Sequence, residues 1–445
     1  MYKPSVIVNI VELYIDEILF LYTQRELALD SSSDNFSDLW ELDERMTAQI
    51  DGLKISGEAS WEACKSLLSF DEPAEIFAAT LSLIPLVLHV PKQKVKQEVK
   101  KKVKQEVKKK VQYEAMEELF EISKGNQCFL DAMASAFLWH EYDDVADLFE
   151  ALYCQKSEEK KYVAIRSWAG YRCGPVNLHD YVLNSLASED ALVSQAALYA
   201  VGELGYNDLV AQLEQAIEHE DENVQFAALW SATRFGSAHA MEKIKQYVSH
   251  PTYGDKALQF IVMQKDIKNT SEILRSLYQD DKTKRRSILG LGYIGNPKII
   301  SQLIQLMEVP ESARIAGDAF STITGLNLEQ SGMIVDAPEE VVAGPSENPD
   351  DESVDLDPDA DLPWPDAGKI AAWWKNTENQ NRFSHADRYF LGQQVNTAQL
   401  QNVLRVGNLK QRVFSAICLA LYEREKPIFN VFSPSMCQMK LLGNR

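Results

Sequence analysis

Apolar residues recur at helical spacing along the chain, in groups that end at a glycine about every thirty residues. Five such groups end at residues 174, 205, 236, 295 and 325, and a weaker one, TYGDKALQFIVMQKDI, fills the gap around residue 266. A second amphipathic segment follows most of them, for example NDLVAQLEQAIEHED. A period near thirty with two helices per unit is typical of an α-solenoid. We therefore predict an all-α fold, with six or seven helix pairs in residues 125–330.

One of these groups contains GLGYIG, residues 290–295, which has the glycine spacing of a dinucleotide-binding loop. A true loop of this kind follows a β-strand and opens a helix. Here the preceding residues are DDKTKRRSIL, and their charges do not suit a buried strand. The following Gly295-Asn296-Pro297 is a helix-stop pattern. We therefore predict that the motif lies near the end of a helix and binds no cofactor.

The first part of the chain, residues 1–90, has helical patterns without the repeat, and we predict that it forms a helical N-terminal cap of the array. Within it, Ser37 is a candidate N-cap, and Gly52 is the candidate end of the same helix. The apolar run 76–90 is shorter than the ~20 residues that a membrane-spanning helix needs. We expect it to be a buried helix.

The N-terminal residues are apolar enough to suggest a signal peptide. Glu12, Asp16 and Glu17 interrupt the apolar run, and no small-residue cleavage site follows. We therefore expect a cytoplasmic protein without a membrane span. Its six cysteines lie far apart in the sequence, which favours reduced thiols over a disulfide scaffold.

A lysine-rich low-complexity insert and a helix are predicted for residues 91–124. The octamer KQEVKKKV occurs twice in tandem, and residues 92–112 hold ten lysines against two glutamates. Such a run is either a basic arm for nucleic acid or acidic lipid, or a solvated insert. It has no arginine, and its first aromatic neighbour is Tyr113, so base stacking is unsupported. We favour the insert.

An acidic, proline-rich stretch follows the array. Residues 336–366 carry twelve acidic residues and no Lys or Arg, and we predict a disordered linker over 331–366. The alternating aspartates 355, 357, 359 and 361 raise the possibility of a calcium loop. However, such a loop needs Gly at its sixth position and Glu at its twelfth, where this chain has Ala360 and Asp366.

The last part, residues 367–445, is predicted to be a helical C-terminal region. The densest cluster of aromatic and basic residues in the chain lies at its start: Trp364, Trp373, Trp374, Arg382 and Arg388. Tryptophan and arginine are enriched in interface hot spots. They are equally common in packing between a cap and a stack of helices, and the sequence leaves both interpretations open. These five residues are the candidate protein-binding site.

The net charge of −21 and the pI near 4.9 disfavour nonspecific binding to nucleic acid or anionic lipid and favour basic partners. None of the seven histidines falls in a known metal-binding spacing, and no nucleophile elbow, phosphate loop or kinase motif occurs. We therefore predict no catalytic, cofactor-binding or metal-binding residues.

Two resemblances add to this interpretation. The units ALVSQAALYAVGELG and KTKRRSILGLGYIG resemble the short HEAT repeats that are also found in phycobilin lyases. In addition, LWELDERMTAQIDGL (39–53), RIAGDAFSTITGLNL (314–328), DPDADLPWPD (357–366), AAWWKNT (371–377), RYFLGQ (388–393) and LKQRVFSAICLAL (409–421) resemble an uncharacterised bacterial family often encoded near type VI secretion genes. That likeness implies a secretion-associated accessory protein without catalytic residues.

The favoured hypothesis is a non-enzymatic scaffold that binds a protein, such as a secretion component, an effector or its carrier. One alternative is an immunity protein that neutralises a basic effector toxin, since charge complementarity steers association. A bilin-lyase-like enzyme is a weaker alternative, because a fold alone does not carry a function. A nucleic-acid binder rests only on the lysine run.

Overall fold

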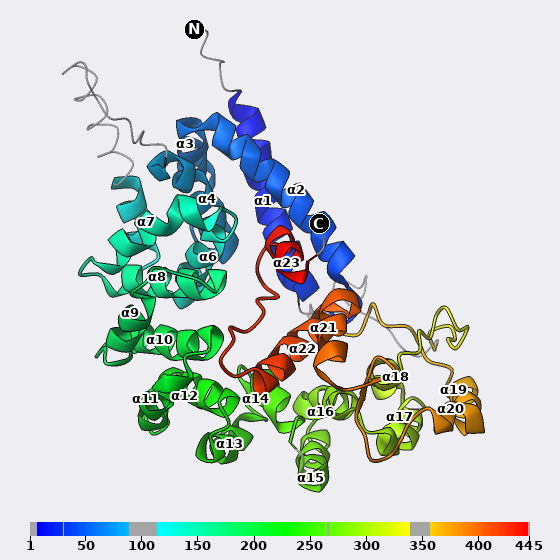
Figure 1. Cartoon of the computed structure of the whole chain (residues 1–445). Coiled ribbons are helices and arrows are strands. Elements are labelled where there is room, and N and C mark those ends of the chain that lie inside the picture. Colours follow the sequence, from blue (N-terminus) through cyan, green and yellow to red (C-terminus); the bar gives the residue numbers. More distant parts are fainter. Residues whose placement is uncertain (1–6, 30, 89–113, 265–266, 339–356, 444–445) are drawn as a thin grey trace, which may run out of the picture. The chain divides into compact units, whose positions relative to one another are not determined.

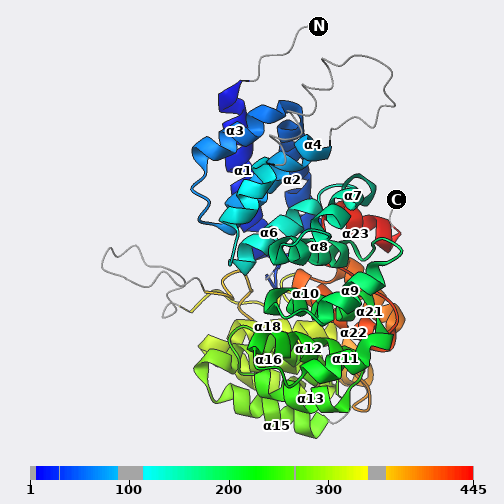
Figure 2. The ribbon, with the colours of Figure 1, turned by 90° about the vertical axis from the view of Figure 1, so that its left-hand side faces the viewer.

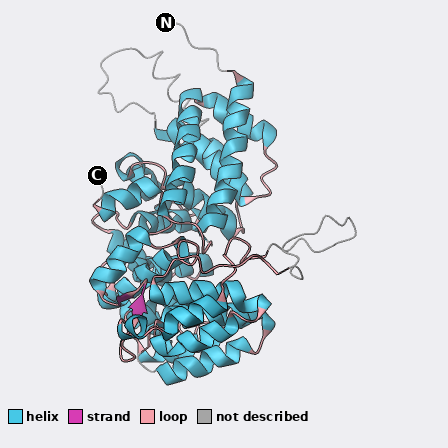
Figure 3. Ribbon diagram, turned by 90° about the vertical axis from the view of Figure 1, so that its right-hand side faces the viewer, coloured by secondary structure: helices cyan, strands magenta, loops and turns pink. Residues whose placement is uncertain are grey.

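The computed structural model describes residues 7–29, 31–88, 114–264, 267–338 and 357–443, and these are almost entirely helical (Figures 1 and 3). The lysine-rich residues 92–112 lie outside the described residues. The chain divides into two compact units. Unit 1 comprises Met1–Leu29, Ser37–Ala228 and Phe432–Arg445, and unit 2 comprises Asp30–Phe36 and Leu229–Val431. The units cut across the predicted segments, because the last helix of the chain joins the N-terminal helices in unit 1.

Unit 1 is built from helices alone in its described part. Their bounds are α1 (Val8–Leu29), α2 (Phe36–Ser56), α3 (Glu58–Leu67), α4 (Pro73–Leu88), a helix over 114–122, α6 (Gln127–Phe137), α7 (Tyr142–Tyr153), α8 (Glu158–Tyr171), α9 (Leu178–Leu186), α10 (Ala191–Leu204), η1 (Asn207–Leu209), α11 (Val210–Ala216) and α23 (Ser435–Leu442). Helix α12 (Glu222–Arg234) contains the boundary between the units.

Unit 2 adds one very small antiparallel strand pair to its helices (Figure 3). Its elements are α13 (Ala238–Ile244), η2 (Lys245–Tyr247), α14 (Gly254–Ile261), α15 (Ile267–Tyr278), α16 (Asp281–Ile294), η3 (Pro297–Ile299), α17 (Ile300–Leu306), α18 (Pro310–Thr324), α19 (Ala367–Lys375), α20 (Thr377–Asn381), β1 (Tyr389–Phe390), β2 (Gln393–Gln394), α21 (Thr397–Val406) and α22 (Leu409–Tyr422).

The repeat array is visible in the alternation of first and second helices. The pairs are α6/α7, α8/α9, α10/α11, α12/α13, α14/α15 and α16/α17, and α18 follows as a further first helix. In unit 1, α8 packs between α6 and α10 (Figure 2). In unit 2, α16 packs against α14, α15 and α18. The prediction of an all-α solenoid with six or seven helix pairs is therefore confirmed.

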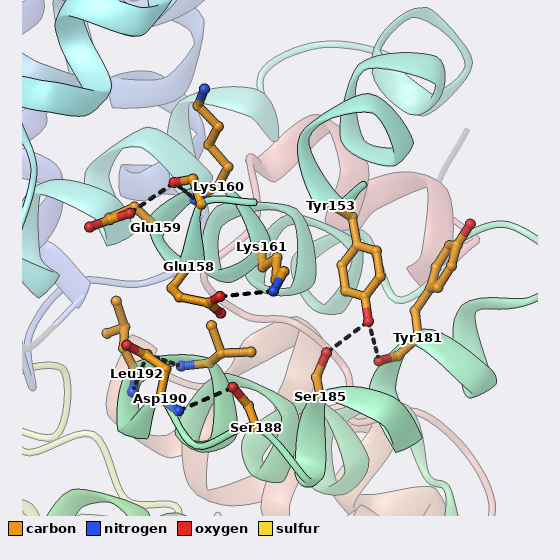
Figure 4. A network of polar contacts seen from close by, with 12 residues as sticks. Tyr153, Glu158, Glu159, Lys160, Lys161, Tyr181, Ser185, Ser188, Asp190 and Leu192 are labelled. Atoms are coloured by element: carbon orange, nitrogen blue, oxygen red, sulfur yellow. Dashed lines mark hydrogen bonds and ion pairs between the residues drawn. The ribbon is translucent and has the colours of Figure 1, made fainter. Parts of the chain in front are cut away.

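Local side chains define where these helices begin. Ser157 accepts a hydrogen bond from Lys160 N at the start of α8, and Asp190 accepts two from Leu192 N and Val193 N at the start of α10 (Figure 4). Asp280 caps α16 in the same way. These side chains satisfy backbone N–H groups that have no partner inside the helix.

Adjacent second helices are also joined by polar contacts. The Tyr153 hydroxyl, at the end of α7, donates to Tyr181 O at 2.9 Å and lies 3.0 Å from Ser185 Oγ on α9 (Figure 4). The Tyr153 and Tyr181 rings also pack together, with centroids 4.4 Å apart. This contact holds α7 against α9, one repeat further along the chain.

Most of the predicted helix ends are correct. Gly205, Gly295 and Gly325 are left-handed C-caps of α10, α16 and α18. The prediction at Gly174 was wrong, because α8 ends earlier, with Arg172 in the left-handed conformation. Gly174 instead makes room for the Leu178 side chain, which starts α9.

The predicted helix end at Gly52 was also wrong, since α2 continues to Ser56. A side chain at Gly52 would have its Cβ 2.6 Å from the Tyr14 ring, so the glycine allows α1 and α2 to approach closely. The expectation of a buried helix near residue 80 is confirmed. Every residue from Ile76 to Val87 in α4 is buried.

The same steric reason explains GLGYIG, which lies at the end of α16 as predicted. A Cβ on Gly290 would meet the Leu274 side chain of α15 at 2.7 Å, and one on Gly292 would lie 2.9 Å from Ala319 Cα of α18. Gly295 is left-handed (φ 69°) and contacts the backbone of Tyr389. Gly290 and Gly292 therefore allow neighbouring helices to pack closely, and Gly295 allows the backbone of Tyr389 to approach the end of α16.

The two ends of the chain meet in unit 1 through a buried ion pair. Arg25 Nε on α1 lies 2.8 Å from Asp43 Oδ1 on α2. The Arg25 guanidinium also donates to the carbonyl oxygens of Phe432 and Ser433, and Ser435 N, at the start of α23, donates to Asp43 Oδ2. Both charges thus have hydrogen-bonded partners, which a buried pair requires.

The α16–α18 contact gives the first prediction. Gly292→Val should destabilise unit 2 by roughly 1–3 kcal/mol, because its added atoms must displace the Ala319 backbone. Chemical denaturation followed by circular dichroism measures this change. Gly368→Ala, whose Cβ would have only an ordinary contact with Asp366, is the matched control and should be close to neutral. Equal stability of Gly292→Val and the wild type would contradict this account.

Candidate protein-binding surfaces

Residues 388–392 of unit 2 cross the C-terminal ends of two helices of the array. Tyr389 N donates to Gly295 O at 2.8 Å, at the end of α16. Leu391 N donates to Thr322 O, and Gly392 N donates to Ile323 O, both near the end of α18. These carbonyls would otherwise lack partners, as the last turn of a helix leaves its C=O groups unpaired. The backbone N–H groups of this segment therefore cap the C-terminal ends of both helices.

Arg388, a predicted site residue, also donates hydrogen bonds to backbone carbonyls in this region. Its guanidinium donates to Val262 O at 2.6 Å, Ile294 O at 2.7 Å and Tyr293 O at 3.1 Å. Burial lowers the pKa of Arg388, and the nearby Cys418 and Tyr422 side chains only partly oppose this effect. Its hydrogen bonds are thus directed to the protein's own backbone.

Three other predicted residues gather near α19 and α20. Trp374 is buried and contacts Phe383 at 5.8 Å between ring centroids, whereas Trp373 is partly exposed and meets Phe320 of α18 edge-on at 5.8 Å. Arg382 is exposed and lies over the Phe383 ring at 5.6 Å. Of this group, Trp373 and Arg382 are accessible to solvent, and Trp374 is not.

Trp364, the fifth predicted residue, packs against Arg314 near the start of α18. The Arg314 guanidinium of α18 sits 4.9 Å above its ring and is paired with Asp357. Arg314 also donates to Asp359 O at 2.7 Å, and Arg285 of α16 pairs with the Asp359 carboxylate at 2.9 Å. Two arginines of the array thus hold Asp357 and Asp359, two of the four aspartates of the possible calcium loop.

The prediction of a disordered linker over 331–366 is therefore wrong at its described ends. Residues 334 and 365 form a β-bridge, Val335 N donates to Trp364 O, and Asp366 N donates to Met333 O. Acidic composition predicted disorder there. However, Arg285 of α16 and Arg314 of α18 compensate the negative charge of Asp357 and Asp359. Residues 339–356 lie outside the described residues.

Close to this network, Asp318 of α18 is a carboxyl group in a mixed charge environment. Burial raises its pKa to about 7, Asp359 adds to the rise, and Arg285 and Lys410 oppose it. Part of its surface remains exposed. Asp318 is thus a group that holds a proton near neutral pH.

Unit 1 contains a second surface that sequence reasoning missed, and we call it the ladder. It consists of Asp131 on α6, Tyr162 and Arg166 on α8, and Tyr199 and Glu203 on α10. The Tyr162 hydroxyl donates to Asp131 Oδ1 at 2.6 Å, and Arg166 donates to Glu203 Oε2 at 2.9 Å. Arg166 also lies over the Tyr199 ring at 6.0 Å.

The ladder is a continuous polar path across three successive first helices. The Asp131 side chain is 48% exposed, Arg166 26% and Glu203 15%, so solvent reaches its charged groups. Although burial alone would lower it, the pKa of Arg166 is raised, first by Glu203 and then by Tyr162 and Asp131. The sequence carries little signal for this surface, because Asp131 and Tyr162 lie one repeat period apart but Tyr199 does not follow at that spacing.

Comparison with known proteins now places the central repeats. Residues 180–258 match the family model of HEAT repeats. This part of the chain is therefore similar to HEAT repeats. The matched HEAT region begins in α9 and contains α10, so the last helix of the ladder lies inside it. Neither the curated proteins nor the solved structures gave a match to this chain.

Three further findings concern the residues that the structure describes. They hold no cluster of three or more His, Cys, Asp or Glu side chains that could bind a metal ion. None of their helices is long and apolar enough to cross a membrane. All six cysteines lie among them, and each is a free thiol.

Asp318 gives a prediction about pH. Its pKa is raised above the value of about 3.8 that it has in the unfolded chain, so the folded state binds the extra proton between these values. Its contribution to stability should therefore fall as the pH rises from about 4 to about 7. Asp318→Asn should gain melting temperature over the wild type across this window and keep the gain at higher pH.

Differential scanning calorimetry of both proteins in a series of buffers measures this difference. Asp180→Asn, an exposed residue of α9, is the control for the loss of one negative charge. A melting-temperature difference for Asp318→Asn that does not change with pH would contradict the assigned proton.

Proposed function

We propose that this protein is a non-enzymatic scaffold that binds another protein on the ladder of unit 1. The observation that carries the proposal is the continuous polar path across α6, α8 and α10, which is partly open to solvent. Repeat proteins commonly bind partners on extended surfaces of this kind, to which each repeat contributes one rung.

The state of the ladder side chains supports binding over catalysis. Asp131 is hydrogen-bonded to Tyr162, and Glu203 lies between Arg166 and Arg172, with the second pair at 3.2 Å. These pairs orient the side chains before a partner arrives, which lowers the entropy lost on binding. Groups that are already held by hydrogen bonds and ion pairs in this way suit recognition of a complementary surface.

We further propose that the partner is a component, effector or carrier of type VI secretion. This proposal rests on the sequence resemblance described above. The structure adds that four of its segments meet in unit 2. The segment at 314–328 contains most of α18, and the segments at 357–366, 371–377 and 388–393 all contact this helix.

The test uses the photo-crosslinker benzoylphenylalanine, placed at Asp131 in the full-length chain. In the native host we expect crosslinks from position 131 to one protein, which mass spectrometry identifies. Asp180, exposed on the second helix α9, is the matched control position and should give no such product. Crosslinks from position 180 alone, or from neither position, would rule out the ladder as the binding surface.

The identity of the captured protein tests the second proposal separately. A protein encoded with a type VI secretion system supports the association. A partner from an unrelated process would remove the link to secretion and leave the scaffold in place.

A further inference from the structure

The first helix of the chain is apolar on two opposite sides. Toward the interior of unit 1, α1 buries Val11, Ile15, Ile18 and Leu21. Yet on its outer side Leu13 is 64% exposed, Phe20 51% and Leu27 54%. Single exposed apolar side chains are normal, but a helix that is apolar on both sides is usually covered on both.

Exposed apolar residues are concentrated at this helix. Seventeen large apolar side chains are exposed in the described part of the chain, and six of them lie on α1 or directly before it: Ile7, Val8, Ile10, Leu13, Phe20 and Leu27. Leu13, Phe20 and Leu27 follow one another at intervals of seven residues. Seven residues fall ~20° short of two helical turns, so these side chains form a single straight row, as in a coiled-coil seam.

We propose that this row pairs with the same row of a second copy, with the two α1 helices antiparallel. The row is symmetric about Phe20, with a leucine seven residues before it and another seven residues after it. A two-fold axis at Phe20 therefore places Leu13 of one copy opposite Leu27 of the other. This is the self-complementarity that a two-fold symmetric interface requires.

Charge favours the antiparallel direction. Three acidic residues of α1, Glu12, Asp16 and Glu17, lie in its N-terminal half, and one, Glu26, lies in its C-terminal half. In the antiparallel arrangement Asp16 faces Gln24 and Glu17 faces Thr23. A parallel pair would instead place each acid opposite its own copy, which is destabilising.

The central residue is already held in place for such a contact. The Arg45 guanidinium of α2 lies 6.0 Å from the Phe20 ring centroid and pairs with Glu17 at 2.6 Å. The pair covers one side of the ring and reduces the negative charge near the proposed axis. Burial of Phe20 against its symmetry mate would thus bring no uncompensated acid to the centre.

The size of the surface indicates a weak dimer. Helix α1 has 22 residues and is therefore about 33 Å long. Two crossing helices of this length bury less than the roughly 800 Å² per partner of a standard interface. We expect dissociation in the micromolar range. This inference does not depend on the proposed function, because the ladder and the outer row of α1 share no residue.

Sedimentation velocity of the full-length protein tests it, over concentrations from about 1 to about 100 µM, which bracket this range. The wild type should shift from monomer to dimer. Leu13→Glu and Leu27→Glu should each weaken the dimer at least about tenfold, because each buries an unpaired charge against a leucine. Val176→Glu, at a fully exposed position outside α1, is the control and should leave the shift unchanged.

The double variant Leu13→Glu with Leu27→Lys distinguishes the directions. In the antiparallel pair each new glutamate faces a lysine of the other copy, so the dimer should return to within about threefold of the wild type. In a parallel pair, each glutamate would face the glutamate of the other copy and each lysine the other lysine, so the variant would stay monomeric. All these positions are exposed, so thermal melting should confirm that each variant is folded.

A wild-type protein that stays monomeric throughout would overturn the proposal. So would a dimer that Leu13→Glu and Leu27→Glu leave unchanged. Failure of the double variant to recover would exclude the antiparallel pairing.

Discussion

The close contact between α16 and α18 at Gly292 is the constraint on which unit 2 depends. Without a Cβ at this position, the two helix backbones approach within the space that a side chain would need. Their C-terminal ends then lie near enough for one short segment, 388–392, to bond to both. Arg285 of α16 and Arg314 of α18 can likewise bind one acidic segment, at Asp357 and Asp359. A glycine pattern that resembles a cofactor loop is therefore a device for helix packing.

Unit 1 relies on polar contacts in a different way. The buried Arg25–Asp43 pair connects α1 and α2 and also binds the backbone at the start of α23. Both charged groups therefore have hydrogen-bonded partners besides each other. The ladder pairs its charges too, but on a surface that solvent reaches. The first arrangement fixes the position of the C-terminal helix. The second prepares a surface whose side chains keep their orientation before binding.

The candidate site was only partly predictable. The five aromatic and basic residues were chosen because their types are common in interfaces, and local spacing does not reveal what each one touches. Arg388 turns to three backbone carbonyls and Trp374 to Phe383, whereas Arg382 remains exposed. The ladder escaped notice for the same reason, since Tyr162 and Asp131 meet only after two repeats have stacked. Whether Trp364, Trp373 and Arg382 contact a partner stays a prediction.

By itself, the sequence determined the all-α repeat architecture, most helix ends and the rejection of a dinucleotide loop. These depend on local physics: the period of apolar residues and the left-handed glycines at 205, 295 and 325. The candidate N-cap Ser37 was wrong, because α2 already begins at Phe36. Only the tertiary structure decided that α2 continues past Gly52, that Gly292 lets α18 approach α16 closely, that Asp357 and Asp359 are held by arginines, and which side of α1 stays open. Each of these outcomes depends on a neighbour far away in the sequence, and the burial or charge that such a neighbour supplies outweighs local preference.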